Sequence, residues 1–390
     1  MKKMNLVSIV ILYVLMGFSS CDKVDGFIGG GGGDGPDEDA GAPLVIAHRG
    51  AQSVLPEHTL EAYKKAIELG ADYIEPDLVM TKDSVLIARH EPFMSGTTNV
   101  ADLSEFAHLK CTKNLDGKEV TDWFASDFTL KQIKKLRAKQ PRSDRSDRFD
   151  GLYQVPTLTE IIALAKSNTT SKGNPVGIYP EMKHPFFHKT LGYGIEDALM
   201  SELSAAGLDS EDDPVFVQCF EVAPLQYINS KYSVKLVQLI STYNVNPDGS
   251  LDYEVPEGEF ISFAAPFDFY ADGDSRTYEY FTTVEGMRFT ASYADGIGPW
   301  KPFIIPFETD ANGAVSVLPA TDFVNLAHQN DLQVHPYTFR NEDEKWSGGD
   351  PEAEYHLFFN AGVDGVFTDY TGEAVHAVAT WDVKGSGDDE

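Results

Sequence analysis

Short apolar runs alternate with amphipathic stretches along most of the sequence, and this alternation is the strongest constraint on its fold. Residues 59–69 illustrate the amphipathic type, with Leu60, Tyr63 and Ile67 on one helical face and Gly70 ending the pattern. Strand–helix alternation favours parallel strands joined by right-handed crossovers. Eight or so such units predict an α/β fold of the TIM-type (β/α)8 barrel class, which needs about 250 residues. The chain has 390 residues, enough for a barrel with long βα-loops.

The expected elements follow from these runs. The expected strands are 44–47, 73–80, 84–89, 176–182, 215–220, 234–240, 332–337 and 364–369. The expected helices are 59–69, 158–166, 193–206, 223–231, 321–330 and 351–361. We predict that residues 44–380 form the barrel. Two polar, mixed segments break the rhythm, an insertion at about 94–156 after the third strand and a segment at 243–307, and such long loops are usually functional.

The N-terminal residues have the features of a bacterial lipoprotein signal peptide. Residues 1–21 hold a short charged start, an apolar stretch and then Phe-Ser-Ser before Cys21, the expected lipidation site. Residues 22–43 are glycine-rich and acidic, which predicts a flexible linker, and residues 381–390 form an acidic tail. We expect an exported protein, anchored to a membrane of the bacterial cell envelope (periplasm or cell surface) by lipid. An ordinary secretory signal or an uncleaved anchor helix is the alternative.

The overall charge limits the partners. The chain has 61 acidic and 31 basic residues, a net charge of −30, which disfavours nucleic acid and anionic surfaces. An anionic substrate would need local positive charge or a bound metal. The three cysteines form no zinc motif, although a disulfide between Cys111 and Cys219 is possible.

Polar side chains gather where the apolar runs end, and in a barrel such positions are typical of active sites. Two acidic residues, Glu75 and Asp77, lie two apart on one run and so share a face, and Glu181 ends another. Carboxylates facing one cavity need a cation between them, and hard oxygen ligands favour Ca²⁺ or Mg²⁺. The expected metal ligands are therefore Glu75, Asp77 and Glu181.

Histidines and cations complete this pattern. His48 and His90 each follow an apolar run, and two histidines can divide the general-acid and general-base roles. Arg49 is placed to clamp a phosphate, and Lys183 adds a second positive charge. A metal, an arginine, a lysine and two histidines together suit phosphoryl transfer.

Each residue also has a structural interpretation when taken alone. A single histidine after a strand is more often a core histidine, and Glu75 with Asp77 could simply pair with Lys or Arg. Glu57 could lie in the first turn of a helix, where its charge favours the dipole. These interpretations do not explain the whole set, since core packing does not place so many polar groups at the same ends of successive strands.

The same stretches resemble the glycerophosphodiester phosphodiesterase family, close to its periplasmic branch. The resemblance covers about residues 44–378. The matching motifs are HRG at 48–50, PEHT at 56–59, GADYIEPDLVMTKD at 70–83, DFTLKQIKKLRA at 127–138, VPTLTEII at 155–162, YPEMKHP at 179–185, VQCFE at 217–221, YADGIGPWK at 293–301, PYTFRNE at 336–342 and GVDGVFTDY at 362–370.

The resemblance implies an enzyme with a TIM barrel and a divalent metal, Ca²⁺ or Mg²⁺, held by Glu75, Asp77 and Glu181. It implies His48 and His90 as the acid–base pair. It implies hydrolysis of small glycerophosphodiesters to glycerol 3-phosphate and an alcohol, through a cyclic phosphate formed by the substrate's own 2-hydroxyl. The residues expected against the substrate are Arg49, Lys183, Gln218 and Phe339.

The sequence departs from the family pattern beside the second histidine. Glu91 follows His90 where many members carry aspartate, so the partner that supports the His90 ring is left open. Two alternative functions also remain open. One is a phospholipase C- or D-like barrel that acts on intact lipids, and the other is a lipid-anchored binding protein without catalysis, against which the complete set of site residues argues.

Overall fold

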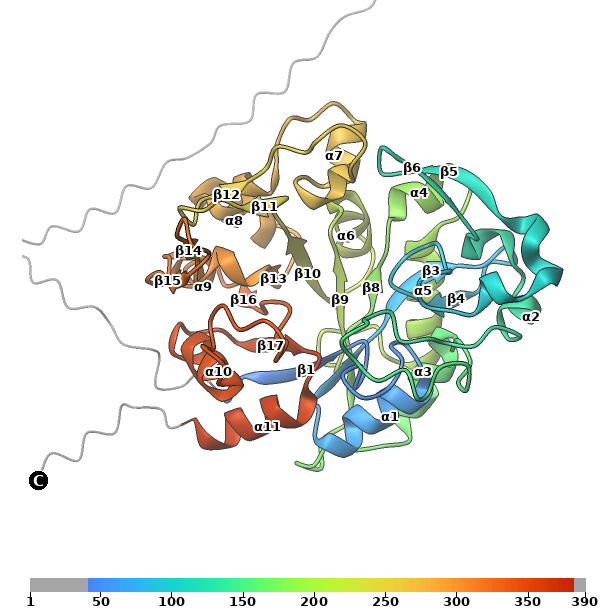
Figure 1. Ribbon diagram of the computed structural model, residues 1–390, viewed down its shortest axis with the longest axis horizontal. Helices are drawn as coiled ribbons and strands as arrows, with labels where there is room; N and C mark the ends of the chain where they lie inside the picture. Colours follow the sequence, from blue (N-terminus) through green and yellow to red (C-terminus); the bar gives the residue numbers. More distant parts are fainter. Residues whose placement is uncertain (1–40, 382–390) are drawn as a thin grey trace, which may run out of the picture. The chain divides into compact units, whose positions relative to one another are not determined.

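The computed structural model describes residues 41–381. The predicted lipoprotein signal peptide with Cys21, nearly all of the predicted linker and residues 382–390 of the predicted tail lie outside this part of the chain. Within it, parallel strands surround a central core and helices cover them (Figure 1). No helix of residues 41–381 is long and apolar enough to span a membrane.

The parallel strands follow one another in the order expected of a (β/α)8 barrel. The second and third barrel strands are each split in two, interrupted at Pro76 and at residues 179–180. In order around the barrel they are β1 (Leu44–His48), β2 (Tyr73–Glu75) with β3 (Asp77–Met80), β7 (Gly177–Ile178) with β8 (Glu181–Met182), β9 (Phe216–Cys219), β10 (Lys235–Ile240), β13 (Gly296–Pro299), β16 (Gln333–Val334) and β17 (Gly365–Thr368).

The strand pairing does not close into one continuous ladder. It forms one sheet from β17 to β7 and another that ends at β16. Single backbone hydrogen bonds join the two edges, from Asp364 N to Val334 O (3.0 Å) and from Phe367 N to Pro336 O (3.0 Å). The barrel interior is packed by Ile46, Tyr179, Phe216, Val237 and Phe367.

The helices agree with the sequence pattern where it was strongest. Thr59 caps the first one by accepting a hydrogen bond from Ala62 N, and Gly70 ends it in the left-handed region (φ 102°). The helices are α1 (Leu60–Leu69), α2 (Leu130–Ile133), α3 (Leu158–Lys166), α4 (Pro185–Thr190), α5 (Ile195–Ala206), α6 (Val222–Asn229), α7 (Phe267–Ala271), α8 (Val284–Ala291), α9 (Phe323–His328), α10 (Pro351–Asn360) and α11 (Thr371–Thr380).

One expected barrel strand is not part of the barrel. The run at 84–89 forms β4 (Leu86–Ala88), which pairs antiparallel with β3. The turn from Thr81 to Ser84 folds the chain straight back, with Ser84 N bonded to Thr81 O, so no helix intervenes. His90 therefore follows a hairpin strand at the sheet edge and not a third parallel strand.

The missing barrel strand is β13, inside the segment at 243–307. Its sequence GIGP lacks the β-branched run that signals a strand. The glycines are needed for packing, since a Cβ on Gly298 would lie 2.6 Å from Leu239 Cδ2 of the neighbouring strand. The close contact with β10 requires glycine in β13. The sequence therefore lacks the run of β-branched residues from which a strand could be predicted.

The insertion at about 94–156 packs around its own small core. Buried side chains such as Phe106, Phe128 and Leu136 contact Val79 and Ile87 of the β3–β4 hairpin. Its regular strands are β5 (Cys111–Leu115) and β6 (Lys118–Asp122), which form an antiparallel hairpin beside α7 (Figure 1). The remaining strands form two further small hairpins, β11 (Asn244–Val245) with β12 (Leu251–Asp252) and β14 (Phe307–Thr309) with β15 (Val315–Val317).

Candidate active site

The strand register places the predicted site residues side by side. His48 is paired with Glu75, Asp77 with Glu181, and Glu181 with Gln218. Paired positions on neighbouring strands lie about 5 Å apart. Residues that are far apart in sequence therefore form one row across β1, β2/β3, β8 and β9, at the C-terminal ends where barrel enzymes have their active sites.

The three carboxylates Glu75, Asp77 and Glu181 form a compact buried cluster. One oxygen from each lies within 4.8 Å of the others. Burial and the neighbouring Asp77 and Glu181 charges raise the pKa of Glu75 well above its usual range. Burial raises the pKa of Glu181 to about 8, with Asp77 adding to this effect and Lys183 opposing it. Such mutual repulsion would be relieved by a bound cation.

The donor atoms of this cluster fit a hard divalent cation. Asp77 Oδ1 and Gln218 Oε1 are buried and accept no hydrogen bond from residues 41–381. The available ligands are all oxygens, which suits Ca²⁺ or Mg²⁺. The residues predicted from the sequence as metal ligands can therefore hold such an ion together.

His48 is oriented by an aspartate that the sequence analysis missed. Its Nδ1 lies 2.7 Å from Asp369 Oδ1, which leaves Nε2 free for the cavity. Gln52 Nε2, Arg145 and Arg340 also donate to Asp369. Burial and the charge of Arg49 lower the pKa of His48 to about 4, against the opposing effect of Asp369. The neutral imidazole, which can accept a proton, is therefore the main form of His48 at pH 7.

Asp369 has the same sequence pattern as the predicted site residues, a polar residue at the end of an apolar run. It directly follows the apolar strand β17, inside the motif GVDGVFTDY. Its pairing with His48 joins residues 321 positions apart. A strand-end carboxylate could have been recognised as a candidate, but its partner could not.

His90 is supported by Glu91, the residue that departs from the family pattern. His90 Nδ1 lies 2.9 Å from Glu91 Oε1. Loss of water, followed by the charges of Arg49 and Lys183, lowers the pKa of His90, and Glu91 opposes this shift. Glu91 is therefore the carboxylate partner of the His90 ring, the position that the sequence analysis left open.

Glu91 also belongs to a chain of ionic contacts beside the site. His184 Nε2 lies 3.4 Å from Glu91 Oε2, and His184 Nδ1 lies 2.6 Å from Asp116 Oδ2. Burial opposes protonation, yet Asp116 and Glu91 raise the pKa of His184 to about 10. The imidazolium therefore links the β5–β6 hairpin to the loop that carries His90.

We expect His184→Asn to lower the free energy of unfolding by about 3 kcal/mol near pH 6, because it removes the cation between the buried carboxylate of Asp116 and the half-buried carboxylate of Glu91. Asparagine tolerates the left-handed backbone at this position (φ 48°). A raised folded-state pKa stabilises below about pH 6.5 and loses that effect as pH rises through about 10. Urea unfolding of both proteins at pH 6 and pH 10.5 should show the difference shrinking.

The control is His108→Asn. His108 is exposed, and none of the ion pairs within residues 41–381 includes it, so this variant removes a histidine and no ion pair. A difference for His184→Asn that is equally large at both pH values would show that the charge of His184 does not stabilise the fold.

The two predicted phosphate-binding cations also point into the site. Arg49 lies 3.0 Å from Glu57 Oε2 and 3.3 Å from Asp77 Oδ2. Lys183 Nζ lies 2.8 Å from Glu181 Oε1. Glu57 precedes α1 and pairs with Arg49, so it acts on the site and is not in the first turn of the helix.

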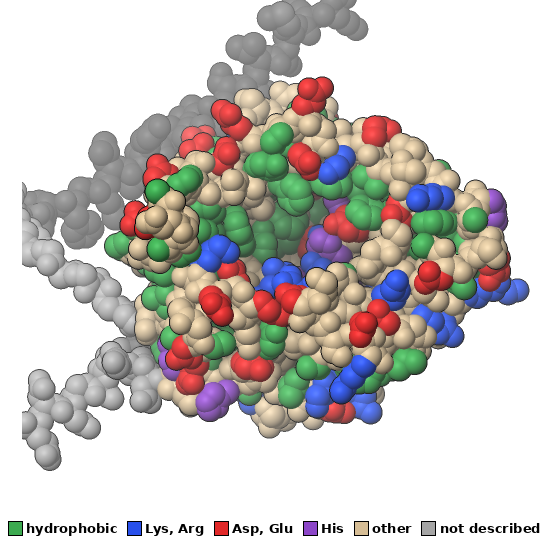
Figure 2. Space-filling view, in the orientation of Figure 1, with side chains coloured by type: hydrophobic (Ala, Val, Ile, Leu, Met, Phe, Trp, Pro, Cys, Tyr) green, Lys and Arg blue, Asp and Glu red, His purple; other side chains and the backbone are tan. Residues whose placement is uncertain are grey.

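These side chains surround a cavity of about 160 Å³, here called the central cavity. Figure 2 shows a hollow on this face, with Lys and Arg side chains at its centre and hydrophobic side chains along one wall. The lining includes His48, Arg49, Glu75, His90, Glu181, Lys183, Gln218, Phe220, Trp300, Tyr337 and Arg340.

Phe339 is the exception among the residues expected against the substrate. Its ring is buried and stacks on Tyr355 at 5.0 Å, with Phe358 also in contact. Its neighbours Thr338 and Arg340 line the cavity instead. The expectation for Phe339 is therefore corrected: at this point of the chain its side chain faces the surrounding helices.

No disulfide joins the two cysteines of the described chain. Cys111 and Cys219 are both free thiols. Cys219 is buried beside the site, and its Sγ lies 3.4 Å from Met182 O. The disulfide that the sequence left possible is absent between these described residues.

The fold and the site together define a barrel enzyme in which two histidines, a cluster of carboxylates and two cationic side chains meet at one cavity. The model of the glycerophosphoryl diester phosphodiesterase family matches residues 48–373. The chain belongs to this family, as its motifs predicted, and is an enzyme of the phosphoric diester hydrolase class.

Curated relatives cover nearly all of the described chain. A glycerophosphodiester phosphodiesterase of Arabidopsis thaliana is 35% identical over 85% of this chain and 84% of its own length. One from Haemophilus influenzae is 31% identical, over 84% of this chain and 87% of its own length.

Solved structures share the fold. A putative glycerophosphoryl diester phosphodiesterase from Silicibacter pomeroyi has a TM-score of 0.57 at 18% identity and covers 88% of this chain and 95% of its own. A phosphodiesterase from Oleispira antarctica, solved with the product sn-glycerol-3-phosphate, has a TM-score of 0.52 at 16% identity. It covers 87% of this chain and 98% of its own.

Proposed function

We propose that this enzyme hydrolyses glycerophosphodiesters to glycerol 3-phosphate and an alcohol, with the help of a divalent metal. The main support is that His48 and His90 line one cavity with the carboxylate cluster, Arg49 and Lys183. The curated relatives named above bear the name of this activity.

Each group has a distinct part in binding. Glu75, Asp77 and Glu181 would hold Ca²⁺ or Mg²⁺, which supplies positive charge to the phosphate oxygens when bound. Arg49 and Lys183 meet the same phosphate from the protein side, and Arg49 is kept in place by Glu57. The cations thereby neutralise the charge that develops on phosphorus-bound oxygens.

The two histidines move the protons. One ring accepts the proton of the substrate's glycerol 2-hydroxyl as its oxygen bonds to phosphorus. The other donates a proton to the alcohol oxygen as its bond to phosphorus breaks, which leaves a cyclic phosphate. Water then opens the ring with the two roles exchanged. Asp369 and Glu91 hold the Nδ1 atoms, so that each Nε2 faces the reacting groups.

This route predicts a strict need for the neighbouring hydroxyl. A phosphodiester whose glycerol is replaced by propane-1,3-diol should react at least about 100-fold more slowly, because an intramolecular nucleophile is lost. Product analysis by ³¹P NMR on matched diesters measures this directly. Brisk hydrolysis of bis(p-nitrophenyl) phosphate would count against the cyclising route.

The same assay separates the alternative functions. Faster cleavage of an intact diacyl phospholipid than of its deacylated form would identify a phospholipase-like enzyme. Binding of every diester without turnover, with Ca²⁺ or Mg²⁺ present, would identify a binding protein that keeps the fold without catalysis.

We also propose that the protein is an exported lipoprotein, tethered through lipid on Cys21. The support is the sequence pattern of residues 1–21 and the glycine-rich stretch that follows it. Labelled palmitate should be incorporated into the wild-type chain in a bacterial host and not into Cys21→Ala, as measured in purified membranes. Equal labelling of both proteins would rule out this anchor.

A further inference from the structure

One buried arginine of the insertion reaches the active site. Arg145 comes from a basic stretch, residues 142–148, in which arginine recurs at every third position. Its side chain is only 2% exposed, and arginine is seldom buried to this extent without a specific partner. Residues 139–150 pass over the loop that follows β1, where Gln140 Nε2 donates to Gln52 O at 3.0 Å. The insertion thus brings a cation to the edge of the active site.

Arg145 binds Asp369, the carboxylate that orients His48. Its Nη2 donates to Asp369 Oδ2 at 2.7 Å, although the two residues are 224 positions apart in the sequence. The other carboxylate oxygen, Oδ1, lies 2.7 Å from His48 Nδ1. Because the guanidinium holds one oxygen, the carboxylate cannot turn away from the imidazole without breaking a buried ion pair. Arg145 therefore fixes the orientation of the group that orients His48.

The same guanidinium orients the side-chain amide of Gln52. Arg145 Nη1 lies 3.3 Å from Gln52 Oε1, so the amide oxygen faces the cation and the amide nitrogen faces Asp369. Gln52 Nε2 donates to Asp369 Oδ1 at 2.7 Å and to His48 O at 3.1 Å. Arg340 Nε donates to Asp369 Oδ2 at 2.9 Å. Donors therefore surround both oxygens of Asp369.

This network selects one tautomer of the neutral His48 ring. Although burial opposes ionisation, the charge of Arg340, followed by His48 and Arg145, lowers the pKa of Asp369 well below its usual range. An ionised carboxylate accepts hydrogen bonds and donates none. The proton of the neutral imidazole therefore lies on Nδ1, and the lone pair lies on Nε2, the nitrogen left free for the central cavity.

Arg145 is itself held in place by a second carboxylate. Its Nε lies 2.8 Å from Glu342 Oε1, and its Nη2 lies 3.2 Å from Glu342 Oε2. Tyr370 donates its hydroxyl hydrogen to Glu342 Oε1 at 2.7 Å, and the guanidinium lies over the Tyr370 ring, 5.5 Å from its centroid. The planar fork of an arginine can make these contacts together with those to Asp369 and Gln52, whereas the single ammonium of a lysine cannot.

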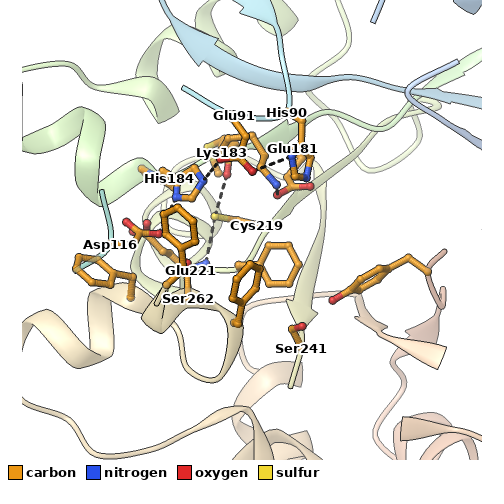
Figure 3. Close-up of a pocket in the computed structure, with 17 residues that line it drawn as sticks. His90, Glu91, Asp116, Glu181, Lys183, His184, Cys219, Glu221, Ser241 and Ser262 are labelled. Atoms are coloured by element: carbon orange, nitrogen blue, oxygen red, sulfur yellow. Dashed lines mark hydrogen bonds and ion pairs between the residues drawn. The ribbon is translucent and has the colours of Figure 1, made fainter. Parts of the chain in front are cut away.

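The insertion contacts the support of the second histidine as well. The carboxylate of Glu91 holds the His90 ring. His184 joins Glu91 to Asp116 at the tip of the β5–β6 hairpin (Figure 3). With Arg145 on the other side, the insertion reaches the carboxylates that support both rings.

We propose that Arg145 is a positioning residue, which holds Asp369 so that His48 presents a free Nε2 to the substrate. Arg145 does this without lining the central cavity. This inference rests on the proposed function, which gives His48 its part in the proton transfers.

The first test measures Arg145→Gln in the wild-type and His48→Ala backgrounds, as full-length proteins with Ca²⁺. In the wild type it should lower kcat on glycerophosphocholine by about 10- to 100-fold, part of the usual contribution of general acid–base catalysis. KM should change by less than about 3-fold, because Arg49 and Lys183 still bind the phosphate. In His48→Ala it should lower kcat by less than about 2-fold, because residues that act as a unit are not additive.

Arg145→Lys keeps the charge and loses the fork, so it should also lower kcat by more than about 3-fold, and only where His48 is present. This variant carries the test if Arg145→Gln does not fold, as judged by circular dichroism. Arg142→Gln is the matched control, since Arg142 lies in the same basic stretch and pairs with the exposed Asp144 at 3.0 Å. It should leave kcat and KM unchanged.

The two backgrounds decide between positioning and a general effect on the fold. Losses of equal size with and without His48 would overturn the proposal. A folded Arg145→Gln with a kcat near that of the wild type would overturn it as well.

NMR spectroscopy separates this proposal from the proposed function. Long-range ¹H–¹⁵N spectra of ¹⁵N-histidine-labelled protein show which ring nitrogen carries the proton, and absence from His48→Ala assigns the His48 signals. The wild type and Arg142→Gln should have the His48 proton on Nδ1, and Arg145→Gln should have a mixture of tautomers. If no diester is hydrolysed but this dependence is found, the positioning role stands and the proposed function fails. Diester hydrolysis with the same His48 tautomer in Arg145→Gln would give the opposite result.

Discussion

Replacing either His48 or His90 by alanine is expected to lower kcat by about 10²- to 10⁴-fold, the usual contribution of general acid–base catalysis. Each ring is fixed by a carboxylate on Nδ1, Asp369 for His48 and Glu91 for His90. KM should change less than kcat, because Arg49 and Lys183 still bind the phosphate. Steady-state kinetics on glycerophosphocholine provide the measurement.

The control is His376→Ala, which removes a histidine whose side chain is 66% exposed on α11. Circular dichroism and the unfolding temperature of all three variants show whether the fold is intact. A variant of His48 or His90 that folds normally and keeps a kcat near that of the wild type would exclude that residue from the proton transfers.

Removal of divalent metal is expected to lower activity by about 10³-fold or more, since a bound metal contributes several kcal/mol to phosphoryl transfer. Activity should return with Ca²⁺ or Mg²⁺. Glu75→Gln should have the same effect in the presence of metal, because it removes the charge of one ligand and keeps the shape of the side chain. Rates after exhaustive EDTA treatment and after titration of metal provide the measurement.

Metal binding can also be followed without activity. Ca²⁺ should raise the unfolding temperature of the wild type, because a ligand of the folded state stabilises it. Glu75→Gln should lose this rise, yet unfold without metal at a temperature no lower than the wild type, since one of three mutually repelling carboxylates is gone. Glu68→Gln on the surface of α1 is the control. Full activity after exhaustive chelation would exclude the metal.

The sequence alone located much of the site because the relevant signals are local. A polar residue directly after an apolar strand marks the C-terminal end of that strand, and parallel strands bring such ends to one face of a barrel. This reasoning found His48, Glu75, Asp77 and Glu181, which the register then places in one row. It failed for Phe339, because nothing in the local pattern says which way a side chain points in an irregular loop.

The strands were also predicted from local composition, and these predictions were wrong where packing against a neighbouring strand decided the structure. The run at 84–89 has strand composition, but its short turn makes it an antiparallel partner of β3. The run at 296–299 lacks strand composition, because close contact with Leu239 requires glycine there. Composition reports how residues pack on average and does not report the neighbour that a particular strand will have.

The sequence by itself determined the family, the barrel class and the identity of the strand-end residues, since each of these is written in short motifs. The tertiary structure alone decided the pairings that orient them: His48 with Asp369, His184 with Asp116, and the insertion with the loop at 259–263. These contacts join residues far apart in the chain. Their energies depend on burial and on charge at close range, which exist only once the barrel has brought the segments together.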